Sequence, residues 1–226
     1  MKTSSKLFIL ILTSVLFIQN SQAYPQFMQR ISEVAQEGHD NSRKGSCGPQ
    51  IFLDVLARYK DSNYPVEEHT VITSDDHVLT LFRIQAKNGP ITEGKPVVYM
   101  QHCLCGSADD YIINGEDNSI GLILANLGYD IWLGNNRGNK YSLGATKKMK
   151  NSKFWDFSFQ EMGKYDVPAI IKYIVEKTNQ QKMVYIGHSQ GTSQMFAALS
   201  MPGTQDYVSQ HISKFLALAP IVYLAN

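Results

Sequence analysis

Hydrophobic and polar residues follow two different periods along the chain, and the period indicates the local structure of each segment. Apolar residues recur at helical spacing over Ile51–Tyr59, which predicts a short amphipathic helix. Apolar and polar residues then alternate over Glu67–Thr73 and Val78–Ile84, on either side of the polar stretch Ser74–His77. This alternation around a polar turn predicts a β-hairpin.

Beyond the hairpin, short apolar runs typical of buried strands alternate with longer segments typical of helices. Strands are predicted over Pro96–Gln101, Tyr129–Leu133, Met183–Ile186 and Phe215–Ala219, and helices over Asp117–Leu127, from Asp166 to about Lys177, and over Thr192–Leu199. Ser158 and Glu161 have the spacing of a capping box. Asp166 is predicted to cap the long helix, because Pro168 fits a first turn but not a helix interior. The fold class is therefore α/β: a mostly parallel sheet with helices on both faces and an antiparallel hairpin at one edge.

Residues 1–23 have the composition of a secretory signal peptide. Lys2 and Lys6 form the basic start, Leu7–Ile18 the apolar stretch, and Ser21-Gln22-Ala23 a small-x-small cleavage site. The apolar stretch is too short to span a bilayer comfortably, so no transmembrane segment is expected after signal cleavage. The pattern predicts entry into the secretory pathway, with an extracellular or lysosome-like destination.

Composition indicates a single folded domain behind a polar leader. Residues 24–48 are polar and glycine-punctuated, while residues 49–226 carry the periodic patterns; the whole chain is 43% hydrophobic and 18% charged. Signal cleavage would remove two of the 21 basic residues and none of the 20 acidic residues, leaving a net charge near −1. Nothing in this balance favours nucleic acid as a partner, or an electrostatic hold on anionic membranes.

The chain has three cysteines, Cys47, Cys103 and Cys105. An odd count in an exported protein permits one disulfide and one leftover thiol. Cys103 and Cys105 are too close in sequence to pair easily, so a bridge from Cys47 to either of them is favoured. His102-Cys103-x-Cys105 lacks a second ligand pair at suitable spacing, so no metal site is predicted.

One motif carries chemistry: Gly187-His188-Ser189-Gln190-Gly191, a G-x-S-x-G match between a predicted strand and a predicted helix. This is the context of a nucleophile elbow, in which a strained turn lifts Ser189 Oγ above the sheet. Glycines are needed at both ends of the motif because neighbouring backbone passes too close for a Cβ. The backbone N–H of Gln190, at the start of the helix, then points where an oxyanion would form. The alternative is a glycine-flanked turn without chemistry.

The second oxyanion donor is expected from the loop that follows Pro96–Gln101. In α/β-hydrolases the loop after this strand supplies that N–H. Leu104 lies there, so Leu104 N–H and Gln190 N–H are predicted to face a tetrahedral intermediate together. The alternative is an ordinary connection with buried cysteines.

Several long motifs in order resemble the acid lipases, the gastric and lysosomal lipase group of the α/β-hydrolases. The resemblance covers about Ile51 to Ala225 and rests on VEEHTVITSDDHVLTLFRI, YMQHCLCGSADDYI, YDIWLGNNRGNKYSL, FWDFSFQEMGKYDVPAIIKYI, YIGHSQGTSQMF and FLALAPIVYL. It implies a serine hydrolase of lipid esters, triglycerides or sterol esters, that acts in lipid degradation without a cofactor. Contact with a lipid interface would be transient.

Two features depart from the family pattern. Cys103 stands where the family has glycine. Family members also continue beyond FLALAP with a cap that forms a lid, and with later strands that carry the triad Asp and His. The resemblance therefore implies a C-terminally truncated α/β-hydrolase domain, with the cap and the last strands missing.

The residues after Ser189 are not expected to complete a triad. Asp206 and His211 follow it in the order Ser–Asp–His, but both precede the strand Phe215–Ala219 and so fall at the opposite edge of the sheet. His211 is expected to be a surface histidine. His188 is excluded as a base because elbow geometry turns its side chain away from Ser189 Oγ, and His102 is expected to be structural.

Two functions of different classes follow. The first is an exported lipase or esterase in which Ser189 attacks an ester carbonyl. The second is a non-catalytic truncated paralogue that only binds lipid or a partner. A general carboxylesterase is a further possibility among enzymes.

Overall fold

The computed structural model describes residues 52, 56 and 63–223, which lie in the second of two units into which the chain divides, residues 45–226. The strands are β1 (Val66–Ile72), β2 (His77–Ile84), β3 (Val97–Gln101), β4 (Asp130–Gly134), β5 (Gly144–Ala145), β6 (Met183–His188) and β7 (Ile212–Leu218). They form one sheet, in the order β1-β2-β4-β3-β6-β7, with the short β5 beside β2. The predicted signal peptide, the predicted polar leader and Cys47 lie outside the described residues.

The sheet is parallel through its centre and antiparallel at one end. β4, β3, β6 and β7 run parallel, whereas β1 pairs antiparallel with β2, and β2 pairs antiparallel with β4. All five residues of β3 and all five of β4 are buried, as expected for strands covered on both faces. The parallel register sets Gln101 beside Gly187, so the loops after β3 and β6 leave the sheet at the same edge.

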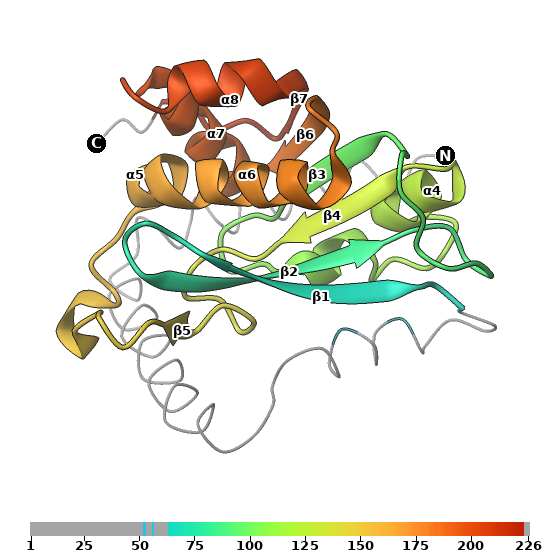
Figure 1. Ribbon diagram of the computed structural model, residues 1–226, viewed down its shortest axis with the longest axis horizontal. Helices are drawn as coiled ribbons and strands as arrows, with labels where there is room; N and C mark the ends of the chain where they lie inside the picture. The colour runs from blue at the N-terminus through green and yellow to red at the C-terminus, as the bar shows by residue number, and fades with distance from the viewer. Residues whose placement is uncertain (1–51, 53–55, 57–62, 224–226) are drawn as a thin grey trace. The chain divides into compact units, whose positions relative to one another are not determined.

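Helices cover both faces of the sheet. They are α4 (Ile120–Asn126), α5 (Phe159–Glu161), the π-helical segment η3 (Met162–Asp166), α6 (Val167–Thr178), α7 (Gln190–Ser200) and α8 (Gln205–His211), with 3₁₀ turns η1 (Ala108–Tyr111) and η2 (Asn151–Lys153). One core packs under α6, α7 and α8, which Figure 1 shows on the same side of the sheet. The other core includes α4 together with Phe52 and Leu56. The predicted α/β architecture is therefore confirmed.

Most predicted elements are present, with small shifts of their ends. The hairpin and the four later strands are confirmed, and Phe52 and Leu56, the described residues of the predicted Ile51–Tyr59 helix, are helical and buried. The helix predicted from Asp117 begins three residues later, at Ile120, and Gly128 follows it with φ of 96°, as a helix-ending glycine does. The pattern missed α8, whose only buried apolar residue is Val208.

The predicted capping box is confirmed, but the predicted cap at Asp166 is wrong. Ser158 Oγ accepts from Gln160 N–H, while the Glu161 carboxylate accepts from Ser158 N–H. Asp166 instead has helical backbone angles and makes no side-chain cap. The helical path runs from Phe159 to Thr178 through the wider turn of η3. The regular helix begins at Val167, directly after that turn, and Pro168 falls in its first turn.

Candidate active site

The turn between β6 and α7 has the geometry of a nucleophile elbow. Ser189 stands between the last residue of β6 and the first of α7, with φ of 52° and ψ of −111°. This is a strained conformation for a residue other than glycine and costs on the order of 1–3 kcal/mol. Hydrogen bonds on both sides hold it: Ser189 N–H donates to Leu218 O at 2.9 Å, and Ser189 O accepts from Thr192 Oγ1 at 2.6 Å.

The two glycines of the motif are required by close backbone contacts. A Cβ at Gly191 would lie 2.3 Å from Gln101 O, and a Cβ at Gly187 would lie 2.7 Å from Gly191 O. Neither contact is possible for real atoms, and both partners are backbone atoms in packed elements. The first turn of α7 is thereby pressed against the end of β3, where the loop with Leu104 begins.

A buried polar network lies directly behind the elbow. We call it the elbow network; it consists of Gln101, His102, Asn136, Gln190 and Gln194. Asn136 Oδ1 accepts from Gln101 Nε2 at 2.7 Å and from Gln194 Nε2 at 3.0 Å. Asn136 Nδ2 donates to Gln190 Oε1 at 3.3 Å. The network therefore joins the end of β3, the loop after β4 and the start of α7.

His102 belongs to this network as a neutral hydrogen-bonding group. Its Nε2 accepts from the backbone N–H of Asn136 at 3.0 Å, so the proton is on Nδ1, which lies 2.7 Å from Cys103 O. Burial lowers the pKa of His102 to about 4, partly opposed by the hydrogen bond to Cys103. These contacts support the structural role expected for this histidine.

Leu104 and Gln190 lie in segments that the structure brings together. Gln190 opens α7, so its N–H has no acceptor within the helix. Leu104 is 39% exposed, at the turn after His102. Cys103, where the resembling family has glycine, is accommodated without positive φ; Cys105 is the residue of this turn with φ of 61°. Their predicted roles as oxyanion donors stay predictions.

Cys103 and Asp110 face each other beside the loop. The Cys103 thiol lies 3.6 Å from Asp110 Oδ2, and burial together with this carboxylate raises the pKa of Cys103 to about 12. Burial also raises the pKa of Asp110. Burial lowers the pKa of His188, and the charge of Asp110 partly opposes that shift. The thiol is thus protonated at neutral pH and a weak nucleophile.

The predicted position of Asp206 and His211 is confirmed, but the predicted exposure of His211 is wrong. Asp206 is exposed in α8, ahead of the first residue of β7, at the sheet edge opposite Ser189. His211 is only 6% exposed, because its Nδ1 pairs with Gln181 O at 2.9 Å and its ring packs on Tyr207. Among the described residues, no hydrogen-bonding partner is found for Ser189 Oγ.

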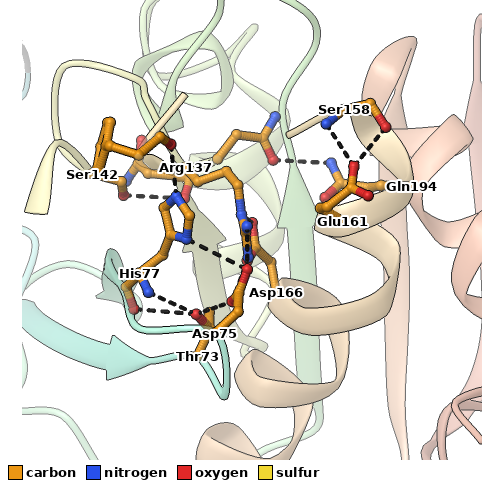
Figure 2. Close-up of polar contacts among 12 residues, drawn as sticks. Thr73, Asp75, His77, Arg137, Ser142, Ser158, Glu161, Asp166 and Gln194 are labelled. Carbon is orange, nitrogen blue, oxygen red and sulfur yellow. Dashed lines mark hydrogen bonds and ion pairs between the residues drawn. The ribbon is translucent and has the colours of Figure 1, made fainter. Parts of the chain in front are cut away.

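Sequence reasoning missed a charged cluster at the edge of the sheet that carries Ser189. We call it the arginine cluster; it consists of Asp75, His77, Arg137 and Asp166 (Figure 2). The buried Arg137 guanidinium pairs with both carboxylates, with Arg137 Nη1 2.7 Å from Asp75 Oδ2 and Nε 3.0 Å from Asp166 Oδ1. In the same cluster, His77 Nε2 lies 3.0 Å from Phe154 O, and His77 Nδ1 lies 3.5 Å from Asp75 Oδ2.

This cluster ties the β1–β2 turn to η3 and contains no nucleophile. Burial raises the pKa of Asp166 to about 6, although Arg137 opposes the shift. Burial alone would also raise the pKa of Asp75, but the nearby His77 ring and the hydrogen bonds from Arg137 and Thr73 outweigh it and hold the pKa well below its usual range. No sequence motif marks the cluster; Arg137 and its two carboxylates are 62 and 29 residues apart in sequence.

Other predicted features give little further chemistry. Over residues 63–223, no group of three or more His, Cys, Asp or Glu side chains could hold a metal ion. Cys103 and Cys105 carry free thiols, and the favoured bridge to Cys47 stays a prediction because Cys47 is not described. No helix in the described part of the chain is long and apolar enough to cross a membrane.

A strained serine between a buried parallel strand and a helix defines an α/β-hydrolase fold. The family comparisons agree: a partial α/β-hydrolase lipase region matches residues 56–115, and the α/β-hydrolase fold matches residues 96–222. With these matches and the similar lipases below, the chain belongs to the acid lipase family of α/β-hydrolases, as the sequence motifs predicted.

The similar curated proteins are lipases about twice as long. Gastric triacylglycerol lipase of Mus musculus is 43% identical over 78% of this chain and 45% of its own length. Lipase member K of Homo sapiens is 42% identical over 82% of this chain and 46% of its own length. The chain thus spans about half the length of the curated relatives it matches.

A solved structure extends the comparison at the level of the fold. Oligopeptidase B of Trypanosoma brucei superposes with a TM-score of 0.52 at 13% identity, covering 73% of this chain and 21% of that one. At this identity the likeness concerns the fold alone.

Proposed function

We propose that this chain carries the nucleophile and oxyanion part of a serine hydrolase that cleaves lipid esters, triglycerides or sterol esters, in lipid degradation. The observation that carries the proposal is the backbone of Ser189, held in a strained conformation between β6 and α7. Such strain costs stability, and here it lifts one hydroxyl above the sheet at the edge where the loop after β3 begins.

In the proposed reaction, Ser189 Oγ attacks the ester carbonyl carbon and its proton passes to a base. The carbonyl oxygen becomes an oxyanion that accepts hydrogen bonds from Leu104 N–H and Gln190 N–H. Each such donor is worth about 3–4 kcal/mol of transition-state stabilisation. The base then gives its proton to the leaving alcohol, and water releases the acid from the acyl-enzyme.

The base and the residue that orients it are the open part of the mechanism. Within residues 63–223, Asp206 and His211 lie at the wrong edge, and the Nε2 lone pair of His102 is occupied by Asn136 N–H. Without a base, a serine hydroxyl is a poor nucleophile near neutral pH.

The lipid substrate and the destination are proposed from the relatives. Curated relatives carry the names gastric triacylglycerol lipase and lipase member K, and the chain shares over two fifths of their residues across the matched region. The predicted signal peptide at residues 1–23 supports a route through the secretory pathway.

The proposal is tested by reacting the purified 226-residue chain with a fluorophosphonate, which labels only an activated serine. Labelling should disappear in Ser189→Ala and persist in Ser193→Ala, which changes a matched serine four residues further along the chain, in α7, buried and bonded to Ile221 O. A folded chain that never reacts would contradict activity of this chain. It would favour the alternative, in which the chain only binds lipid or a partner.

A further inference from the structure

We propose that Asn136 is a positioning residue that aligns both oxyanion donors, Leu104 N–H and Gln190 N–H, from a single point behind the elbow. The inference rests on the proposed function, since it concerns the same site. Asn136 lies two residues beyond the end of β4, is 3% exposed and forms hydrogen bonds through its backbone N–H and both atoms of its side-chain amide.

The first link runs from the backbone of Asn136 to Leu104. Asn136 N–H donates to His102 Nε2 at 3.0 Å, as does Asn139 Nδ2 at 3.1 Å, so the ring proton must be on Nδ1. Nδ1–H then donates to Cys103 O at 2.7 Å.

That bond sets the direction of the next N–H. The Cys103–Leu104 peptide is trans and planar, so its C=O and its N–H point in opposite directions. Cys103 O is held from one side by His102 and also accepts from Gly106 N–H at 3.1 Å. Leu104 N–H is therefore turned away from His102, and the direction is determined through Asn136.

The second link runs from the side chain of Asn136 to α7. Its Oδ1 is occupied by two donors, Gln101 Nε2 and Gln194 Nε2, which fixes the orientation of the amide. Nδ2 then faces Gln190 Oε1 at 3.3 Å. Gln190 is the first residue of α7, so this contact holds the residue whose backbone N–H is the other donor.

Asn135 provides a matched control for a purely structural role. It is 0% exposed, and its side chain is equally engaged: Oδ1 accepts from Ala108 N–H at 3.0 Å and from Asn139 Nδ2 at 2.9 Å, and Nδ2 donates to Thr80 O at 3.0 Å. None of these partners belongs to α7 or to the turn at Leu104. Asn139 also contacts His102, but His102 Nε2 keeps its bond from Asn136 N–H when Asn135 is replaced. Replacing Asn135 should therefore cost stability without disturbing the two donors.

The first measurement is amide hydrogen exchange of the 226-residue chain, which needs no catalysis. The reporters are Gly106 N–H, bonded to Cys103 O, and Thr192 N–H, bonded to Ser189 O. In Asn136→Ala, which keeps the backbone N–H bonded to His102, Thr192 N–H should exchange at least about tenfold faster. In His102→Ala, which breaks the first link, Gly106 N–H should do so, whereas in Asn135→Ala only Ala108 N–H should accelerate. An unchanged Thr192 N–H in Asn136→Ala, or an unchanged Gly106 N–H in His102→Ala, would overturn the proposal.

The second measurement separates positioning from folding in the fluorophosphonate reaction. In Asn136→Ala the rate constant of bond formation should fall at least about tenfold, with little change in probe affinity or in the fraction finally labelled. A lower labelled fraction at an unchanged rate constant would indicate a structural role and contradict the proposal.

A further variant guards against loss of folding. Gln190→Met removes the bond between Asn136 and the first residue of α7 and leaves the bond from Gln194. Thr192 N–H should therefore exchange faster while Gly106 N–H stays protected; protection of both would contradict the second link. If the wild-type chain is never labelled, the proposed function fails, while the exchange data still decide the role of Asn136.

Discussion

Two adjacent residues, Asn136 and Arg137, send their side chains into polar networks of opposite kinds. Asn136 joins the elbow network through neutral amides and an uncharged imidazole. Arg137 enters the arginine cluster, where one cation lies between two carboxylates. Both side chains are buried, so one short loop after β4 supports the candidate site on one side and a charged tie to the hairpin on the other.

The difference lies in what each network requires from its surroundings. A neutral amide network needs only matched donors and acceptors, and it adds no net charge near a position where an oxyanion would form. A buried ion cluster pays a desolvation cost and depends on every member being present. The two networks should therefore fail in different ways when a single residue is changed.

The largest effect is expected on the elbow side, from Gly191→Ala. The new Cβ would lie 2.3 Å from Gln101 O, in a packed strand that cannot move without disrupting the sheet. We expect a loss of at least about 4 kcal/mol in the free energy of unfolding, measured by urea denaturation. Gly89→Ala is the control, since no atom lies within 4 Å of its Cβ position; similar stability of the two variants would contradict the tight contact.

On the other side, Arg137→Met should cost about 3–5 kcal/mol at pH 7, because the buried Asp166 and the partly exposed Asp75 lose the cation that both are bonded to. Urea unfolding measures this loss. Adding Asp75→Asn and Asp166→Asn to the variant should recover most of it. The matched control is Lys153→Met, which breaks an exposed pair with Asp156 and should leave stability nearly unchanged. Equal losses would show that burial does not distinguish these pairs.

These sites also show what the sequence could and could not predict. The hairpin, the strands and the elbow were predictable because their signals are local: periodicity, a capping box and two glycines around one serine. The role of Arg137 was not, because its partners come from distant segments. The predicted cap at Asp166 was wrong for the same reason, because the Asp166 carboxylate pairs with the distant Arg137. The predicted exposure of His211 was also wrong, since its hydrogen-bond acceptor, Gln181 O, lies 30 residues away in sequence and no local pattern indicates it.

The two networks should also differ in the sign of their pH dependence, beginning with His102. Its pKa is about 4 in the folded chain against the ordinary 6.5, so the unfolded chain binds the proton first as pH falls. The stability that this histidine contributes is present above pH 6.5 and is lost toward pH 4. At about 1.4 kcal/mol per pKa unit, His102→Gln should gain about 3 kcal/mol relative to wild type over that range. Parallel unfolding free energies of the two proteins, measured from pH 7 to pH 4, would contradict this.

Asp166 should show the opposite sign. Its folded pKa of about 6 exceeds the ordinary 3.8, so the folded chain binds the proton more tightly. That stability is present below pH 3.8 and is lost as pH rises through 6, whereas the lowered pKa of Asp75 acts only below its ordinary value. From pH 6 down to pH 4, Asp166→Asn should therefore lose up to about 3 kcal/mol relative to wild type.

The contributions of His102 and Asp166 nearly cancel between pH 4 and 6, so neither should stand out in the wild-type stability profile. The slope contributed by Asp166 becomes measurable when His102→Gln is present: stability should then fall as pH rises from 4 to 6, and adding Asp166→Asn should abolish the fall. A slope that persists in His102→Gln/Asp166→Asn would mean that another group titrates, and that the opposite pH dependence does not arise from the two networks that meet at Asn136 and Arg137.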